Sequence, residues 1–264
     1  MRITLLLLCT LAVTGCVRHL GAPEGEPPAL PDYDVTVIED RVYTPDDWPQ
    51  ALHADIYRPA PNGRYPAVLM VHGGGWERRS PEDTAELSRR LAEQGFVVVN
   101  IEYRFAPEYT FPAQLHDLQM AMRWVHVHAD NYGIDRARVG AWGYSSGAHL
   151  VTLLATVAAD SDSPLNRPYG GLVTRPRAVV AGGTPTDLRK FQGGTLVPQF
   201  LGGPQATRSA TYAAASPITH VTAGTPPHLL YHGTLDSVVP VDHAEDYRTA
   251  LNANGVDNEL LLLR

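Results

Sequence analysis

The chain has 264 residues, of which 44% are hydrophobic and 19% are charged, and its formal net charge at neutral pH is -7. This length suits one large α/β domain, and the composition is typical of a globular protein. The negative charge and the lack of a basic run argue against binding to nucleic acid and against a purely electrostatic hold on anionic lipid.

The N-terminal residues are expected to lie outside the folded domain. An apolar run after Arg2 is too short to span a bilayer, which indicates a secretory signal peptide over residues 1–15. The run ends in VTGC, which resembles the bacterial lipobox, so Cys16 is expected to carry lipid and to anchor an exported protein in the cell envelope. An ordinary signal peptide with a chance cysteine is the alternative. Prolines and glycines predict a flexible tether in the rest of residues 16–33.

The cysteine count excludes one kind of chemistry. Cys9 and Cys16 are the only two cysteines, and both belong to the N-terminal segment. The domain over residues 34–264 is therefore expected to have no disulfide and no cysteine nucleophile.

From residue 34 onward, apolar patterns of strand type alternate with patterns of helix type, which predicts a mostly parallel central sheet with helices on both faces. The expected strands are 35–38, 52–57, 66–71, 96–101, 138–142, 178–181, 228–232 and 259–263. The expected helices are 81–94, 111–129, 146–158 and 241–254. Residues 188–217 are rich in Gly, Pro, Ala and Thr, which predicts a cap or insertion over a site.

The strongest motif is GYSSG at residues 143–147, between an expected strand and an expected helix. A nucleophile elbow requires this context. Its glycines let strand and helix approach closely around a strained turn, so the hydroxyl of Ser145 is expected at the carboxyl edge of the sheet. The backbone N–H of Ser146 is expected to face the substrate oxygen. An ordinary glycine-rich turn is the alternative for the motif taken alone.

A second glycine motif, HGGGW at residues 72–76, follows the expected strand that ends at Val71. Backbone N–H groups in such a loop can point into a pocket and stabilise the oxyanion of a tetrahedral intermediate. A phosphate-binding loop is the alternative, but its lysine and the following hydroxyl residue are absent. The two motifs together predict a serine hydrolase.

Asp236 lies in a turn after the expected strand 228–232. It is placed to orient a catalytic histidine, and the chain order of serine before aspartate suits an α/β-hydrolase. A turn-forming or capping role is the alternative for an aspartate in a turn.

These motifs, with EYRFAPE at 102–108, FPAQ at 111–114 and PTDL at 185–188, make the chain resemble hormone-sensitive-lipase-like bacterial esterases and the related feruloyl and acetylxylan esterases. The resemblance implies an α/β-hydrolase fold over residues 34–264 and cleavage of a carboxylic ester through an acyl-enzyme. Because the protein is expected to be exported and anchored, we expect an ester with a small or short-chain acyl group, or one carried on a polysaccharide. The resemblance implies Ser145 as nucleophile, Asp236 as acid, and oxyanion N–H groups from Gly74, Gly75 and Ser146. It also implies structural support from Tyr103, Arg104 and Glu108, and no metal or organic cofactor.

The family places its catalytic histidine shortly after the last strand, and the sequence ends at Arg264. We therefore expect the C-terminal end of the fold, with the general base, to be missing and the chain as given to be nearly inactive. The strand 259–263 is then expected at an exposed sheet edge, which predicts poor solubility. Only His243 follows Asp236, and its place early in an expected helix favours a solvated or capping role.

Two other histidines are expected to act as supports, and three more are expected not to form a metal site. His72 belongs to the glycine loop and His149 to the helix after Ser145, so both are expected to be hydrogen-bonded supports. His116, His126 and His128 share one expected helix, but the last two are two residues apart and so lie on different faces, and the spacing makes no metal site.

Two alternatives to an esterase remain open from the sequence. An amidase, formamidase or aminopeptidase-like hydrolase would use the same triad on an amide bond, and a catalytically silent binding lipoprotein would use none of it. Residues 188–217 show no readable specificity pocket, so the acyl group, the alcohol and the oligomeric state are not predicted.

Overall fold

The computed structural model describes residues 17–21 and 29–264. The expected signal peptide at residues 1–15 and the expected lipid attachment site at Cys16 lie outside the described residues. Among the residues that are described, no helix is both long enough and apolar enough to cross a membrane.

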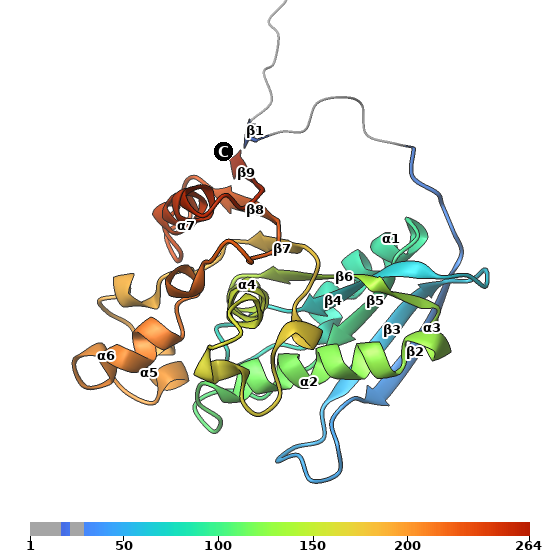
Figure 1. Ribbon diagram of the computed structural model, residues 1–264, viewed down its shortest axis with the longest axis horizontal. Coiled ribbons are helices and arrows are strands. Elements are labelled where there is room, and N and C mark those ends of the chain that lie inside the picture. The colour runs from blue at the N-terminus through green and yellow to red at the C-terminus, as the bar shows by residue number, and fades with distance from the viewer. Residues whose placement is uncertain (1–16, 22–28) are drawn as a thin grey trace, which may run out of the picture.

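Nine strands form one sheet (Figure 1). They are β1 (Val17–Leu20), β2 (Val35–Val42), β3 (His53–Pro59), β4 (Tyr65–Val71), β5 (Val97–Ile101), β6 (Ile134–Tyr144), β7 (Val179–Gly182), β8 (His228–Gly233) and β9 (Asn258–Leu263). Their order in space is β1-β9-β8-β7-β6-β4-β5-β3-β2. The neighbours from β9 to β5 run parallel, whereas β3 is antiparallel to β2 and β5. The predicted mostly parallel sheet is confirmed.

Seven α-helices connect the strands in the described part of the chain. They are α1 (Ala85–Glu93), α2 (Ala113–Val127), α3 (Ala129–Tyr132), α4 (Ser146–Ala159), α5 (Leu196–Leu201), α6 (Gln205–Ala214) and α7 (Asp242–Ala253). The segment 188–217, expected as a cap or insertion, contributes α5 and α6. The four helices expected elsewhere match α1, α2, α4 and α7 within a few residues.

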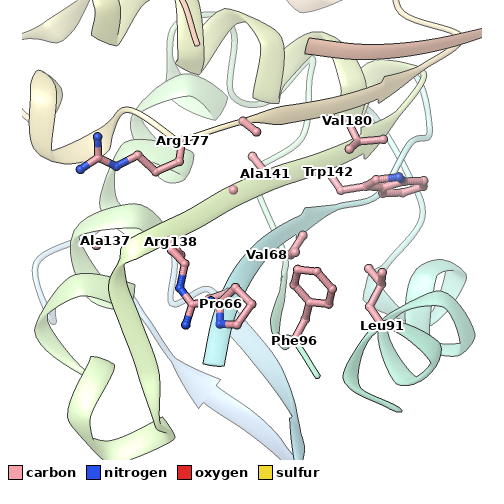
Figure 2. A pocket seen from close by; sticks show the side chains of 13 residues that line it. Pro66, Val68, Leu91, Phe96, Ala137, Arg138, Ala141, Trp142, Arg177 and Val180 are labelled. Carbon is pink, nitrogen blue, oxygen red and sulfur yellow. The ribbon is translucent and has the colours of Figure 1, made fainter. Parts of the chain in front are cut away.

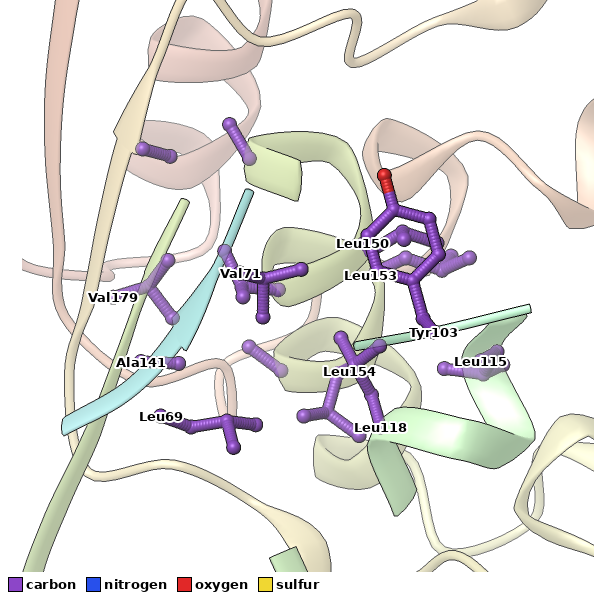
Figure 3. Close-up of a cluster of buried hydrophobic side chains, with 14 of the residues drawn as sticks. Leu69, Val71, Tyr103, Leu115, Leu118, Ala141, Leu150, Leu153, Leu154 and Val179 are labelled. Atoms are coloured by element: carbon purple, nitrogen blue, oxygen red, sulfur yellow. The ribbon is translucent and has the colours of Figure 1, made fainter. Parts of the chain in front are cut away.

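The helices lie on both faces of the sheet, as expected. The larger core contains side chains of α2, α4 and α7, and Figure 3 shows Leu150, Leu153 and Leu154 of α4 between the sheet and helix α2. A smaller core on the other face contains Met70 and Ala92, where α1 packs on β3, β4 and β5. The strands that carry the chemistry are therefore anchored mainly by α4, which is mostly apolar and almost wholly buried.

The face of the sheet that α1 covers is partly open. A cavity of about 480 Å³ lies there beside α1, and Figure 2 shows Val68, Phe96, Trp142 and Val180 among the side chains that line it. Parallel sheets are usually covered on both faces, yet in residues 17–21 and 29–264 no helix other than α1 lies on this face. None of the predicted catalytic or oxyanion residues lines this cavity, so an apolar cavity alone does not locate the site.

The N-terminal segment corrects two expectations. Residues 17–20 form β1, which pairs antiparallel with β9 from Val17 opposite Leu263 to Leu20 opposite Leu260. His19 Nε2 also lies 2.7 Å from Glu259 Oε2. The strand 259–263 is therefore not the exposed edge that was expected, because β1 covers it, and this part of 16–33 is not a free tether. The basis for expecting poor solubility from that edge is wrong.

Candidate active site

Ser145 lies at a sharp turn between β6 and α4. Its backbone has φ 53° and ψ -121°, a sparsely populated conformation for a residue with a side chain. Two hydrogen bonds hold the turn: the Ser145 N–H donates to the carbonyl of Gly182 in β7 (2.7 Å), and its carbonyl accepts from the His149 N–H (2.9 Å). The residue therefore lies at the carboxyl edge of the sheet, where the sequence places a nucleophile.

The glycine two residues later is required by close packing. A Cβ on Gly147 would overlap the carbonyl oxygens of Val71 and His72, so the first turn of α4 lies directly against the end of β4. Any side chain at this position would push the helix away from the strand. The second glycine of the GYSSG motif thus sets the distance between the elbow and the HGGGW loop.

The two glycine motifs converge. A Cβ built on Gly73 would lie 3.4 Å from Ser145 Cβ, which is van der Waals contact. Gly74 has φ 122°, and a Cβ on it would overlap the carbonyl oxygen of Arg78, so only glycine fits this bend. Within residues 17–21 and 29–264, the N–H groups of Gly74, Gly75 and Ser146 find no acceptor in the protein. The bend therefore presents free backbone donors next to the serine.

The aromatic residue that ends the HGGGW loop ties it to the elbow helix. Trp76 donates from Nε1 to Nδ1 of His149 (3.2 Å), and His149 Nε2 donates to the carbonyl of Ala215 (2.7 Å). His149 is thus a buried hydrogen-bonded support, as expected. The other expected support, His72, pairs through Nδ1 with the carbonyl of Gly73 (2.7 Å), while its buried Nε2 has no partner among the described residues.

Of the three residues after β5 that were expected as supports, two make supporting contacts and one does not. The Tyr103 hydroxyl lies 3.2 Å from the carbonyl of His72 and 3.5 Å from Ser146 Oγ, so it links the two motifs. Arg104 forms a buried ion pair with Asp117 of α2 (2.7 Å). Both supporting roles are confirmed. Glu108 is exposed, and no hydrogen bond or ion pair to it is found in the described part of the chain, so its supporting role is wrong.

The buried imidazole predicts a pH dependence of stability. Burial lowers the pKa of His149 to about 4 from an ordinary value of 6.5, so acid protonates this residue more readily in the unfolded chain. The shift makes the folded state lose about 3 kcal/mol as the pH falls through that interval. Glutamine keeps hydrogen-bonding groups but does not titrate. Between about pH 7 and pH 4, the free energy of unfolding of His149→Gln, measured in urea, should therefore fall by about 3 kcal/mol less than that of the native protein. Equal losses in the two proteins would rule out a buried neutral imidazole.

Asp236 follows β8, at the same edge of the sheet as Ser145, because β6, β7 and β8 run parallel. Its Oδ1 accepts from the N–H groups of Val238 and Val239, both at 2.9 Å. Its Oδ2 lies 3.9 Å from Nε2 of His232, but that nitrogen donates to the Val239 carbonyl (2.7 Å). One carboxylate oxygen therefore closes the turn, and the other is left to orient a further group.

The histidine after Asp236 does not have the role expected for it. His243 is 1% exposed, its Nδ1 accepts from the Asp187 N–H (3.3 Å), and its ring stacks on Phe191 with centroids 5.0 Å apart. The expectation of a solvated or capping residue is wrong, because α7 turns this face toward the sheet. No side chain in residues 17–21 and 29–264 hydrogen-bonds to Ser145 Oγ, so these residues supply no general base in contact with it.

Two cavities meet at Ser145 and share Gly75, Leu196 and Val238 as lining residues. The larger, of about 350 Å³, has polar and charged residues in its wall: Arg78, Arg79, Asp83, Thr84 and Tyr144. The smaller, of about 150 Å³, has mostly apolar side chains: Trp76, Pro185, Phe191, Val197 and Val239. The sequence did not predict Leu196 or this division, since 188–217 carries no periodic pattern.

A sequence model of the BD-FAE family matches residues 54–251. The chain belongs to the BD-FAE family. It is 31% identical to the esterase LipC of Mycobacterium tuberculosis over 242 residues, which are 88% of this chain and 60% of LipC. It is 25% identical to an acetyl ester-xyloside bifunctional hydrolase from Caldicellulosiruptor lactoaceticus, with a TM-score of 0.73 and coverage of 89% of this chain and 86% of that one.

A second solved structure supports the same fold. Esterase Est2 of Thermogutta terrifontis is 27% identical, with a TM-score of 0.70 and coverage of 90% of this chain and 83% of that one. The expected α/β-hydrolase fold and esterase family are therefore confirmed. The chain spans 49% of the length of LipM, a probable carboxylic ester hydrolase of Mycobacterium tuberculosis, and 60% of the length of LipC.

Proposed function

We propose that the protein is a serine hydrolase that cleaves carboxylic esters through an acyl-enzyme. One observation carries the proposal: the strained Ser145 lines one cavity with Gly73, Gly74 and Gly75, and the backbone donors of Gly74, Gly75 and Ser146 have no acceptor among the described residues. A nucleophile beside preorganised donors is the arrangement that acyl transfer needs, because negative charge develops on the carbonyl oxygen.

In the proposed reaction, Ser145 Oγ attacks the carbonyl carbon of the ester while a histidine takes its proton. The N–H groups of Gly74, Gly75 and Ser146 stabilise the oxyanion. As the intermediate collapses, the histidine returns the proton to the leaving alcohol, and water then hydrolyses the acyl-enzyme by the same route. Asp236 would orient the histidine and stabilise its charged form.

The mechanism needs a histidine that the described residues do not bring to Ser145. A serine hydroxyl is a poor nucleophile at neutral pH without a base, and removing the base from a comparable triad lowers the rate by about six orders of magnitude. We therefore propose that residues 1–264 alone hydrolyse esters only marginally and that a longer form, where the gene encodes one, supplies the base. Export and lipid attachment at Cys16 are also proposals, and they rest on the sequence alone.

The substrate is proposed to be an ester with a small acyl group, free or carried on a polysaccharide. Comparing hydrolysis of p-nitrophenyl acetate with that of N-formyl and aminoacyl anilide substrates tests the choice. The esterase proposal expects the acetate ester to be cleaved with a kcat/KM at least about a hundredfold higher than either amide. A preference for an amide would favour the amidase alternative, and the absence of any Ser145-dependent turnover in the longest encoded form would favour a silent binding protein.

A further inference from the structure

Leu196 lies between the two cavities that meet at Ser145. It lines both of them, and its Cδ2 and Cδ1 atoms lie 3.2 and 3.3 Å from the point where a Cβ on Gly75 would be. Since Gly75 is a proposed oxyanion donor, the leucine side chain covers the loop right beside the reacting atoms. No other residue of α5 lines both cavities.

The position of Leu196 is fixed by packing one turn further along α5. The ring of Phe200 stacks on Trp76 of the glycine loop, with centroids 4.5 Å apart and planes 8° from parallel. The Phe200 carbonyl also accepts from the Phe111 N–H (2.8 Å). Trp76 directly follows Gly75 and holds helix α5 through this stack. The position of Leu196 relative to Gly75 is therefore fixed.

The two cavities differ in the groups that they suit. The cavity of about 150 Å³ is lined mostly by apolar side chains and glycines, and an apolar cavity of about this volume holds a benzene-sized group. The wall of the cavity of about 350 Å³ has both polar and apolar parts, with two arginines, an aspartate and a threonine beside Trp142 and Val238, so it suits a larger leaving group that carries polar atoms. An ester carbonyl bound at Gly74 and Gly75 directs its acyl and alkoxy parts to opposite sides, so each cavity can take one part.

We propose that Leu196 is the specificity-determining residue that separates an acyl cavity from an alcohol cavity and limits the acyl group to about six carbon atoms. The inference rests on the proposed function, and it names the acyl class of the substrate. Shortening Leu196 moves back one wall of the small cavity, so this cavity can hold a longer acyl chain while the large cavity still holds the alcohol.

The test uses the longest form that the gene encodes and p-nitrophenyl esters with acyl chains of about two to ten carbons. The native protein should lose at least about tenfold in kcat/KM from the butyrate to the octanoate ester, and Leu196→Ala should recover about tenfold in that ratio. Leu201→Val, at a buried position of α5 that lines neither cavity, is the matched control and should leave the ratio unchanged. An unchanged ratio in Leu196→Ala, or the same shift in Leu201→Val, would overturn the inference while leaving the esterase proposal intact.

A binding measurement keeps the two proposals separable if no form hydrolyses esters. Butyrate and octanoate are titrated into the protein and into Leu196→Ala, and binding is followed by ligand-detected NMR. The inference expects butyrate to bind both proteins and octanoate to bind the variant at least about tenfold more tightly than the native protein. If the native protein and Leu196→Ala bind octanoate equally well, Leu196 does not limit the acyl length, and this conclusion holds whatever the reason that no ester is hydrolysed.

Discussion

Ser145→Ala is expected to lower kcat for p-nitrophenyl acetate by about six orders of magnitude in a form of the protein that hydrolyses this ester. The substitution removes the hydroxyl of the strained residue while leaving the backbone donors in place. Steady-state kinetics with the purified variant measure the effect, and intact-protein mass spectrometry should show an acyl adduct on the native protein alone.

The matched control for the nucleophile is the next residue in the chain. Ser146 contributes a backbone N–H to the proposed oxyanion site, but its hydroxyl lies 3.5 Å from Tyr103 and has no part in the proposed reaction. Ser146→Ala should therefore change kcat by less than about tenfold, since the N–H remains. A larger loss of kcat in Ser146→Ala than in Ser145→Ala would show that Ser146, and not Ser145, is the nucleophile.

Asp236→Asn is expected to lower kcat by about four orders of magnitude, as the corresponding change does in a comparable triad. Asparagine keeps an oxygen that can accept from the N–H groups of Val238 and Val239, which Asp236 Oδ1 accepts now, so the turn should survive. Only the charge that stabilises the protonated histidine is lost. Thermal unfolding should show a nearly unchanged Tm, and kinetics should show the loss.

A second carboxylate at the same edge of the sheet serves as its control. Asp187 follows β7, but both of its oxygens are held by Arg189, at 2.7 and 2.9 Å. Asp187→Asn should therefore lower kcat by no more than about tenfold. If Asp187→Asn proves the more damaging of the two, the acid of the proposed triad is Asp187 and the assignment of Asp236 is wrong.

The parts of the site that the sequence predicted are those set by local geometry. The elbow at Ser145 and the loop at Gly74 each need a strand, a tight bend and glycines within a few residues, and such patterns are readable along the chain. Since parallel strands end at one edge of the sheet, the order of the strands was enough to place Asp236 at that edge too.

What the sequence did not predict depends on contacts between distant segments. The pairing of β1 with β9 joins residues near opposite ends of the chain, and the sequence of Val17–Leu20 contains no pattern that predicts which strand it pairs with. The burial of His243 depends on how α7 faces the sheet, and the position of Leu196 depends on the stack between Trp76 and Phe200. Such packing is set by the tertiary fold rather than by local propensity.

A disulfide cross-link between the two glycine motifs tests whether residues 73 and 145 lie side by side in the folded protein. A Cβ at position 73 would lie 3.4 Å from Ser145 Cβ, close to the separation of about 3.5–4.5 Å in a disulfide. With Cys9 and Cys16 changed to serine, Gly73→Cys combined with Ser145→Cys should form a disulfide on mild oxidation, detected by peptide mass spectrometry. Gly73→Cys combined with Ser237→Cys, at a residue that lines another cavity at the end of β8, should not. Two free, reactive thiols at 73 and 145 in the folded protein would contradict the convergence on which the hydrolase proposal depends.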